Sequence, residues 1–190
     1  RLSLKWEKFL KVLVTDRYPT DCLNALKKIN ADIHRSQDLQ PTAEELKNTE
    51  ALLIRSRTKV GDKLLSKASD LKIIITATSG FDHIDLKACE EKGVKVSYTP
   101  NANAQSAAEH TLFLMLGALK NIPMVEKAKS QGQWKDKIQT GNELYGKTVG
   151  IIGMGRVGKA LAHLLTPFKT KTIAYDPYVD GDLIREFHAD

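Results

Sequence analysis

The stretch KTVGIIGMGRVGKALAHLLTPFKTKTIAYDPY, residues 147–178, decides how the rest of the chain is interpreted. Its apolar, β-branched run at residues 148–152 predicts a strand buried on both faces of a parallel sheet. A glycine-rich turn follows at residues 153–158, and small or apolar residues then recur at helical spacing. A second strand is predicted at residues 172–175, and Asp176 follows it directly. This order of strand, glycine turn, helix, strand and acid is typical of a dinucleotide-binding site.

The glycines and the acid each have a physical role in such a site. Gly153 permits a tight turn out of the strand, Gly155 lets the backbone approach a pyrophosphate, and Gly158 lets the helix pack against the strand. The helix N-terminus offers free N–H groups to the pyrophosphate. Asp176 would bind the ribose hydroxyls of the adenosine and repel a 2′-phosphate, which favours NAD over NADP. Two plainer interpretations stay open: a tight turn in an unrelated α/β protein, and an ordinary strand-end cap at Asp176.

Length, composition and charge argue against several classes of protein. The chain has 190 residues, 42% of them hydrophobic, which suffices for one large or two small domains. Its net charge of +6 is spread over segments of mixed sign, so we expect no nucleic-acid partner. No apolar run approaches the roughly 20 residues that span a bilayer, so we expect no membrane partner and a cytoplasmic location. Cys22 and Cys89 lack the spacing of a disulfide framework or metal site, so we expect two buried thiols and no metal.

Apolar segments alternate with polar, helix-like segments in the first half of the chain. The predicted strands lie at residues 12–14, 31–33, 51–54, 73–76 and 94–96, and the predicted helices at 21–29, 42–47, 62–68 and 85–92. Thr42 with Glu45 has the pattern of a capping box, and Gly93 stands where a helix C-cap is needed. The alternation predicts a parallel, doubly wound α/β sheet with the flavodoxin-like strand order.

The alternation stops at Pro100–Asn103, which we interpret as a hinge. The pattern beyond it predicts a long helix over residues 104–120, capped by Ser106 with Glu109, and a second helix after Pro123. The apolar face of the long helix is predicted to comprise Leu112, Met115, Leu116 and Leu119.

Two domains follow from this break. We expect residues 1–102 to form a complete first domain and residues 103–190 to begin a Rossmann domain. A polar loop through Trp134 and Gly141 would lead to the dinucleotide strand. A fold of this type needs about six parallel strands, whereas two are predicted before a last helical segment near residues 184–188. We therefore expect the chain to be a truncated part of a longer protein.

Two strand ends in the first domain carry candidate binding residues, because ligands of open α/β sheets bind beyond the carboxyl ends of strands. Arg55 and Arg57 follow the third strand, and Ser79 with Gly80 follows the fourth. Arg55 could bind a carboxylate or phosphate through two N–H groups, and the Ser79 and Gly80 backbone N–H groups could bind an anion. A solvated loop for the arginines and a plain turn for Ser79–Gly80 remain the alternatives.

Several motifs together resemble the D-isomer-specific 2-hydroxyacid dehydrogenase family. The resemblance covers nearly the whole chain, with the motifs in the family's order, although His83 stands where the family often has Asn and no glycine precedes Ser79. The motifs are Arg55-Ser56, residues 79–85, residues 100–103, residues 106–109, residues 153–158 and Tyr175-Asp176-Pro177.

The resemblance implies an NAD-dependent enzyme that oxidises a small, anionic D-2-hydroxy acid by hydride transfer. It also implies a substrate domain formed by residues 1–102 and a returning C-terminal segment, with the NAD-binding domain inserted between them, and a homodimer or higher homo-oligomer. The implied substrate-binding residues are Arg55, Ser79 and Gly80. The implied cofactor-binding residues are Ser79, Gly153, Gly155, Arg156, Val157, Gly158 and Asp176.

No catalytic residue is assigned within this chain. The family's catalytic Arg, His and Glu would lie downstream of Asp190, so we expect residues 1–190 alone to be inactive. His110 and His163 fall in predicted helices, and we interpret them as surface or packed residues. An alternative stays open, because the family's scaffold also serves NAD-sensing corepressors of transcription that dimerise.

Overall fold

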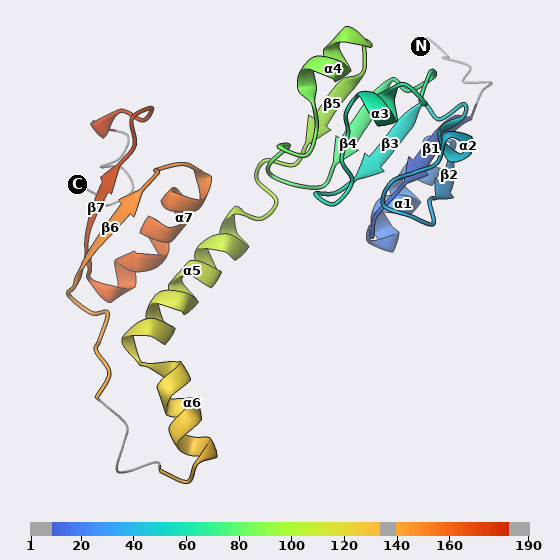
Figure 1. The fold of residues 1–190 in the computed structure, drawn as a ribbon. Coiled ribbons are helices and arrows are strands. Elements are labelled where there is room, and N and C mark those ends of the chain that lie inside the picture. Colours follow the sequence, from blue (N-terminus) through green and yellow to red (C-terminus); the bar gives the residue numbers. More distant parts are fainter. Residues whose placement is uncertain (1–8, 134–139, 183–190) are drawn as a thin grey trace. The chain divides into compact units, whose positions relative to one another are not determined.

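The protein is described by a computed structural model that covers residues 9–133 and 140–182. The chain forms two compact units that meet at Ala102 and Asn103. Each unit has its own sheet and its own buried core (Figure 1). The predicted helical segment at residues 184–188 and most of the predicted polar loop, including Trp134, lie outside the described residues.

The first unit contains a five-stranded parallel sheet (Figure 1). Its strand order is β2-β1-β3-β4-β5, which confirms the predicted flavodoxin-like arrangement. The register is continuous, with Val14 opposite Arg35 and Ile54 opposite Thr76. The strands are β1 (Leu10–Val14), β2 (Ala31–Arg35), β3 (Ala51–Ile54), β4 (Ile73–Thr76) and β5 (Lys95–Tyr98).

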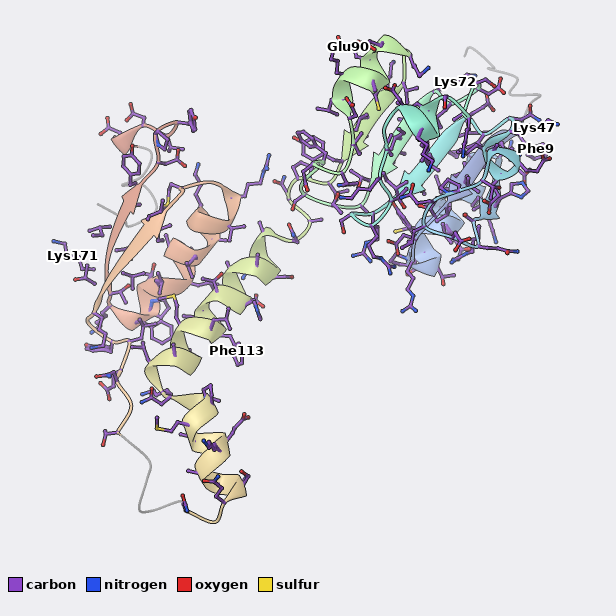
Figure 2. The ribbon with its side chains drawn as sticks, viewed as in Figure 1. Phe9, Lys47, Lys72, Glu90, Phe113 and Lys171 are labelled. Atoms are coloured by element: carbon purple, nitrogen blue, oxygen red, sulfur yellow. The ribbon has the colours of Figure 1, made fainter. Side chains whose placement is uncertain are left out.

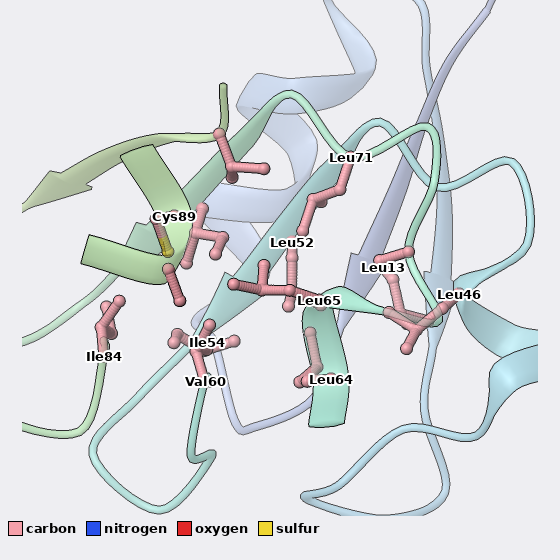
Figure 3. Packing of buried hydrophobic residues seen from close by; sticks show 14 residues of the cluster. Leu13, Leu46, Leu52, Ile54, Val60, Leu64, Leu65, Leu71, Ile84 and Cys89 are labelled. Atoms are coloured by element: carbon pink, nitrogen blue, oxygen red, sulfur yellow. The ribbon is translucent and has the colours of Figure 1, made fainter. Parts of the chain in front are cut away.

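Helices cover both faces of this sheet, because alternate strand residues point to opposite sides. On one face, Leu52 and Ile74 pack with residues of three short helices around a core that includes Cys89 (Figure 3). On the other, Val12 and Leu53 pack with α1. The helices are α1 (Thr20–Lys27) on the second face, and α2 (Ala43–Leu46), α3 (Asp62–Leu65) and α4 (Leu86–Glu91) on the first.

Local sequence signals explain where two of these helices begin and end. Thr42 and Glu45 form the predicted capping box, in which each side chain accepts the other residue's backbone N–H. Gly93 adopts a φ of 69° directly after α4, a left-handed conformation that favours glycine. The predicted buried state of both cysteines is wrong in part: Cys89 is buried, but Cys22 is exposed on α1.

The second unit contains two helices, then two parallel strands joined by a third helix. Its elements are α5 (Ala104–Leu119), α6 (Ile122–Ser130), β6 (Thr148–Ile152), α7 (Arg156–Leu165), a 3₁₀ turn (Thr166–Phe168) and β7 (Lys171–Tyr175). The predicted apolar face of α5 packs on α7 and the sheet, through Leu112, Met115, Leu116 and Leu119.

Two predictions for this unit are wrong. The side chains of β6 are not buried on both faces: Ile151 points into the core, whereas Ile152 is 92% exposed. The reason is that α5 and α7 both pack on the face of the sheet that carries Ile151. Tyr175, on the neighbouring strand, lies on the opposite face with Ile152 and is also exposed. Ser106 does not cap α5, because the helix already begins at Ala104 and Asn103 occupies the N-cap position without a side-chain bond.

Candidate functional site

The glycine turn of the second unit has the backbone geometry that its sequence predicts. Gly153 has a φ of 97°, and its N–H donates to the Tyr175 carbonyl at 2.8 Å, which joins the turn to the end of β7. A Cβ at Gly158 would overlap the Gly153 carbonyl oxygen, so only glycine lets α7 pack this closely. A Cβ at Gly155 would meet nothing within 4 Å. Open space therefore lies where a ligand phosphate would approach the backbone.

The N-terminus of α7 supplies the hydrogen-bond donors of this turn. Gly155 is the N-cap residue of α7. Because glycine has no side chain, no capping side chain accepts hydrogen bonds from the first N–H groups of the helix. Arg156 and Val157 are the first two helical residues, and both are exposed. An anion at this end would meet free N–H groups and the positive end of the helix dipole.

Asp176 lies directly beside the glycine turn. One carboxylate oxygen accepts the Met154 backbone N–H at 2.7 Å, and the other accepts the Tyr178 backbone N–H at 2.9 Å. The side chain therefore has the strand-end capping role and also joins the end of β7 to the turn. A carboxylate offers about four acceptor positions, so these two bonds leave capacity for two ribose hydroxyls.

The candidate substrate residues lie on neighbouring strands of the first unit. Ile54 and Thr76, the last residues of β3 and β4, are paired in register, so Arg55 and the Ser79–Gly80 turn leave the same edge of the sheet. The Tyr18 hydroxyl donates to the Ile54 carbonyl at 2.7 Å, and burial raises the pKa of Tyr18 to about 12.

The two arginines after β3 have different environments. Arg57 binds the Asp16 carboxylate through two nitrogens, at 2.7 and 3.3 Å. The hydrogen bond from Arg57 lowers the pKa of Asp16, whose side chain is 2% exposed. Arg55 is exposed and has no ion pair within the described part of the chain. Arg57 therefore serves the fold, while Arg55 remains available to a ligand.

The Ser79–Gly80 turn presents backbone donors. Among the described residues, neither the Ser79 nor the Gly80 N–H has an acceptor. The residue before the turn is bonded to the segment after β5, because the Thr78 carbonyl accepts the Thr99 N–H at 3.0 Å. The Phe81 ring also contacts the Tyr98 ring edge-on, with centroids 5.1 Å apart. A rigid turn with free N–H groups suits an anionic ligand.

Sequence reasoning missed the residues that support these groups. Asp16 follows β1 and fixes Arg57 across 41 positions of sequence. Thr76, Thr78 and His83 are joined by hydrogen bonds beneath the Ser79–Gly80 turn. The available signal was the pair of threonines at the carboxyl end of β4, with Thr76 as its last residue and Thr78 two positions later, since a buried hydroxyl needs a partner.

Other candidate chemistries find no support in the described residues. His110 and His163 lie on α5 and α7 and are exposed, as predicted. No group of His, Cys, Asp or Glu in residues 9–133 and 140–182 could hold a metal ion. None of the helices described there is long and apolar enough to cross a membrane.

Comparison with known proteins identifies the family. The model of the family described as "D-isomer specific 2-hydroxyacid dehydrogenase, catalytic domain" matches residues 12–176. The chain belongs to the D-isomer specific 2-hydroxyacid dehydrogenases. Within this family, the D-3-phosphoglycerate dehydrogenase of Methanocaldococcus jannaschii is 38% identical over 175 residues, which cover 92% of this chain and 33% of that protein. The human D-3-phosphoglycerate dehydrogenase is 35% identical over 179 residues, or 93% of this chain and 34% of that protein.

A solved dehydrogenase of the family shares the fold. D-lactate dehydrogenase from Aquifex aeolicus, complexed with NAD and lactic acid, is 30% identical with a TM-score of 0.80. The match covers 94% of this chain and 55% of that one. The chain thus spans about a third of the length of these curated relatives and about half of this solved dehydrogenase.

Proposed function

We propose that the protein containing this chain is an NAD-dependent oxidoreductase that oxidises D-3-phosphoglycerate to 3-phosphohydroxypyruvate, a step of serine biosynthesis. The observation that carries the cofactor assignment is the position of Asp176 beside a glycine turn with open space at Gly155. The choice of substrate is supported by the relatives named D-3-phosphoglycerate dehydrogenase, which match over nine-tenths of the chain. These names favour an enzyme over the NAD-sensing corepressor.

The residues of the second unit fit NAD as the hydride acceptor. The Gly155 backbone and the N-terminus of α7, with Arg156 and Val157, would hold the pyrophosphate. Asp176 would bind the adenosine ribose through the acceptor positions that Met154 and Tyr178 leave free. A 2′-phosphate would place negative charge against this carboxylate, so NADP would bind less well.

The residues of the first unit fit an anionic hydroxy acid. Arg55 would bind a carboxylate or phosphate with its planar guanidinium, and the Ser79 and Gly80 N–H groups would bind anionic oxygens. Ser79 is also a candidate for contact with the cofactor. Because these donors are held in place by the sheet, they need little reorganisation when the ligand binds.

The proposed oxidation needs a group that accepts the proton of the substrate hydroxyl. Within the described residues, one histidine pairs with a carboxylate: His34 Nε2 lies 2.8 Å from Asp32 on the edge strand β2. Both side chains are about half exposed, which does not provide the excluded-water environment of an acid/base pair. We therefore expect residues 1–190 alone to give no turnover, and turnover by them would make His83 and His110 the first residues to mutate.

A homodimer or higher homo-oligomer forms part of the proposal. Phe113, labelled on α5 in Figure 2, is 64% exposed and Leu114 is 55% exposed, and neither belongs to the cluster that packs α5 on α7. A helix with apolar residues on two sides is typical of an element buried twice. Sedimentation of the full-length protein with Phe113→Asp should show dissociation if α5 forms the interface.

The decisive experiment is an assay of the full-length protein. NADH formation should be measured with D-3-phosphoglycerate, with D-lactate and without substrate, and NADP should replace NAD in parallel. We expect turnover with D-3-phosphoglycerate and NAD. Turnover with D-lactate but not with D-3-phosphoglycerate would support the proposed NAD-dependent oxidation and contradict the proposed substrate. NAD binding without turnover on either acid would favour the corepressor.

A further inference from the structure

A chain of three hydrogen bonds connects His83 to the Ser79–Gly80 turn. His83 Nε2 lies 3.0 Å from Thr76 Oγ1, and Thr76 Oγ1 lies 2.7 Å from Thr78 Oγ1. Thr78 Oγ1 then donates to the Gly80 carbonyl at 2.6 Å. Thr76 is fully buried and His83 is 4% exposed, so solvent has little access to the first of these bonds.

The direction of every bond in this threonine–histidine chain follows from its last member. A carbonyl only accepts, so the single hydroxyl proton of Thr78 is used on Gly80. Thr78 must therefore accept from Thr76, and the single proton of Thr76 is used in turn. Thr76 must then accept from His83, which requires a proton on Nε2 of the imidazole. The neutral His83 side chain is thus restricted to one tautomer.

We propose that His83, Thr76 and Thr78 are positioning residues for the substrate, which act by fixing the Gly80–Phe81 peptide group directly after the Ser79 and Gly80 donors. The proposal rests on the assignment of the Ser79 and Gly80 N–H groups as substrate donors. The Thr78 hydroxyl holds the Gly80 carbonyl, and so the Gly80–Phe81 peptide group, while the Thr99 N–H holds the Thr78 carbonyl, and so the peptide group that carries the Ser79 N–H. The peptide group that carries the Gly80 N–H lies between these two fixed groups, which limits its rotation away from the ligand. Such a preformed donor arrangement binds an anion without first reorganising.

The same geometry separates His83 from acid/base catalysis. Its Nε2–H is committed to a buried hydroxyl, and burial lowers the pKa of His83, with Asp82 opposing and Lys59 assisting this shift. Protonation of Nδ1 would leave the Nε2–H donor in place, so the chain tolerates both charge states. A positioning role therefore requires no change of protonation during turnover.

The kinetic test removes one hydroxyl at a time from the full-length enzyme. Thr78→Val and Thr76→Val should raise KM for D-3-phosphoglycerate about fivefold to tenfold at unchanged kcat, because a less well positioned N–H donor weakens a substrate contact that is made equally in the ground and transition states. Thr78→Ser keeps the hydroxyl and should restore the wild-type KM. Thr49→Val is the matched control, because this fully buried threonine donates to the Glu45 carbonyl before β3, away from the turn. Equal KM values in all four variants would overturn the proposal.

A spectroscopic test is independent of the reaction. In ¹⁵N-histidine-labelled protein, with His83→Asn used to assign the signal, we expect His83 to carry its proton on Nε2 at neutral pH. Thr76→Val should shift this signal by removing the acceptor. A proton on Nδ1 in the wild type would reverse the bonds and overturn the proposal even in an active enzyme. If instead the tautomer is as expected but D-3-phosphoglycerate gives no turnover, the proposed function fails and D-lactate becomes the substrate for the KM comparison.

Discussion

The Asp176 carboxylate accepts the backbone N–H of Met154 at 2.7 Å, so the acid that directly follows β7 also stabilises the glycine turn that follows β6. Substituting this residue would therefore change two things at once, the turn and the ribose contact. Asp176→Asn removes the charge and keeps the Met154 bond through its amide oxygen, while the bond from the Tyr178 N–H is lost because an NH2 group cannot accept it.

For Asp176→Asn in the full-length protein, we expect the free energy of NAD binding to weaken by up to about 3 kcal/mol. Hydrogen bonds to a charged group contribute about 1.5–3 kcal/mol, and the amide oxygen retains part of that contribution. NADP affinity should rise relative to NAD, because the repulsion of a 2′-phosphate is removed. Calorimetric titration with both cofactors checks this, with Asp180→Asn as a control on a neighbouring exposed acid. Equal affinities for NAD and NADP in the wild type would show that Asp176 does not select the cofactor.

Arg55 and Arg57 should respond differently to the same substitution. Arg55→Ala should raise KM for the hydroxy acid and leave the unfolding temperature unchanged, since Arg55 has no ion pair in the described residues. Arg57→Ala should lower the unfolding temperature, because it leaves the buried Asp16 carboxylate without its partner. Arg55→Lys should restore KM only in part, since lysine lacks the planar fork. Kinetics and thermal unfolding of the three variants decide the assignment, which an unaltered KM for Arg55→Ala would refute.

Gly155 and Gly158 form a second matched pair. Gly158→Ala should lower the free energy of unfolding of the second unit by at least about 1–3 kcal/mol, because the new Cβ would overlap the Gly153 carbonyl oxygen. Gly155→Ala should fold normally, since its Cβ meets nothing within 4 Å, but should weaken NAD binding by occupying the space proposed for the pyrophosphate. Denaturant unfolding and NAD titration of both variants separate these effects. Normal NAD affinity in Gly155→Ala would place the pyrophosphate elsewhere.

The sequence was sufficient where structure depends on local pattern. The capping box at Thr42 and the packing role of Gly158 follow from spacing within a few residues, and the strand order of the first unit follows from the alternation of apolar and helix-like segments along it. Each is fixed by backbone geometry and by the periodicity of apolar side chains.

Features that depend on distant partners could not be predicted. The Arg57–Asp16 ion pair joins residues 41 positions apart, and the hydrogen bond of Thr76 with His83 crosses a turn whose path the sequence does not specify. The exposure of Ile152 likewise depends on which face of the sheet α5 and α7 cover. The apolar sequence of a strand indicates only that burial of its side chains is favourable. Which helix or strand covers them depends on residues elsewhere in the sequence.

Stability of the first unit should depend on pH in two separate windows. Burial lowers the pKa of His83 below its ordinary value of 6.5, so the unfolded chain binds a proton that the folded chain resists. Stability should therefore fall as pH drops below about 6.5 and level off under the folded pKa. The hydrogen bond from Arg57 lowers the pKa of Asp16 below 3.8, so a second loss should begin near pH 4 and continue as this carboxylate is protonated.

Thermal unfolding of wild type, His83→Asn and Asp16→Asn between pH 8 and 3 resolves the two contributions. His83→Asn should flatten the loss between about pH 6.5 and 5 and keep the loss below pH 4, whereas Asp16→Asn should do the reverse at a lower overall stability. The slopes are more informative than the absolute temperatures, because each variant also loses hydrogen bonds that do not titrate. An unchanged slope near pH 6 in His83→Asn would mean that the His83 imidazole is protonated as easily in the folded chain as in the unfolded one, against its burial beside Thr76.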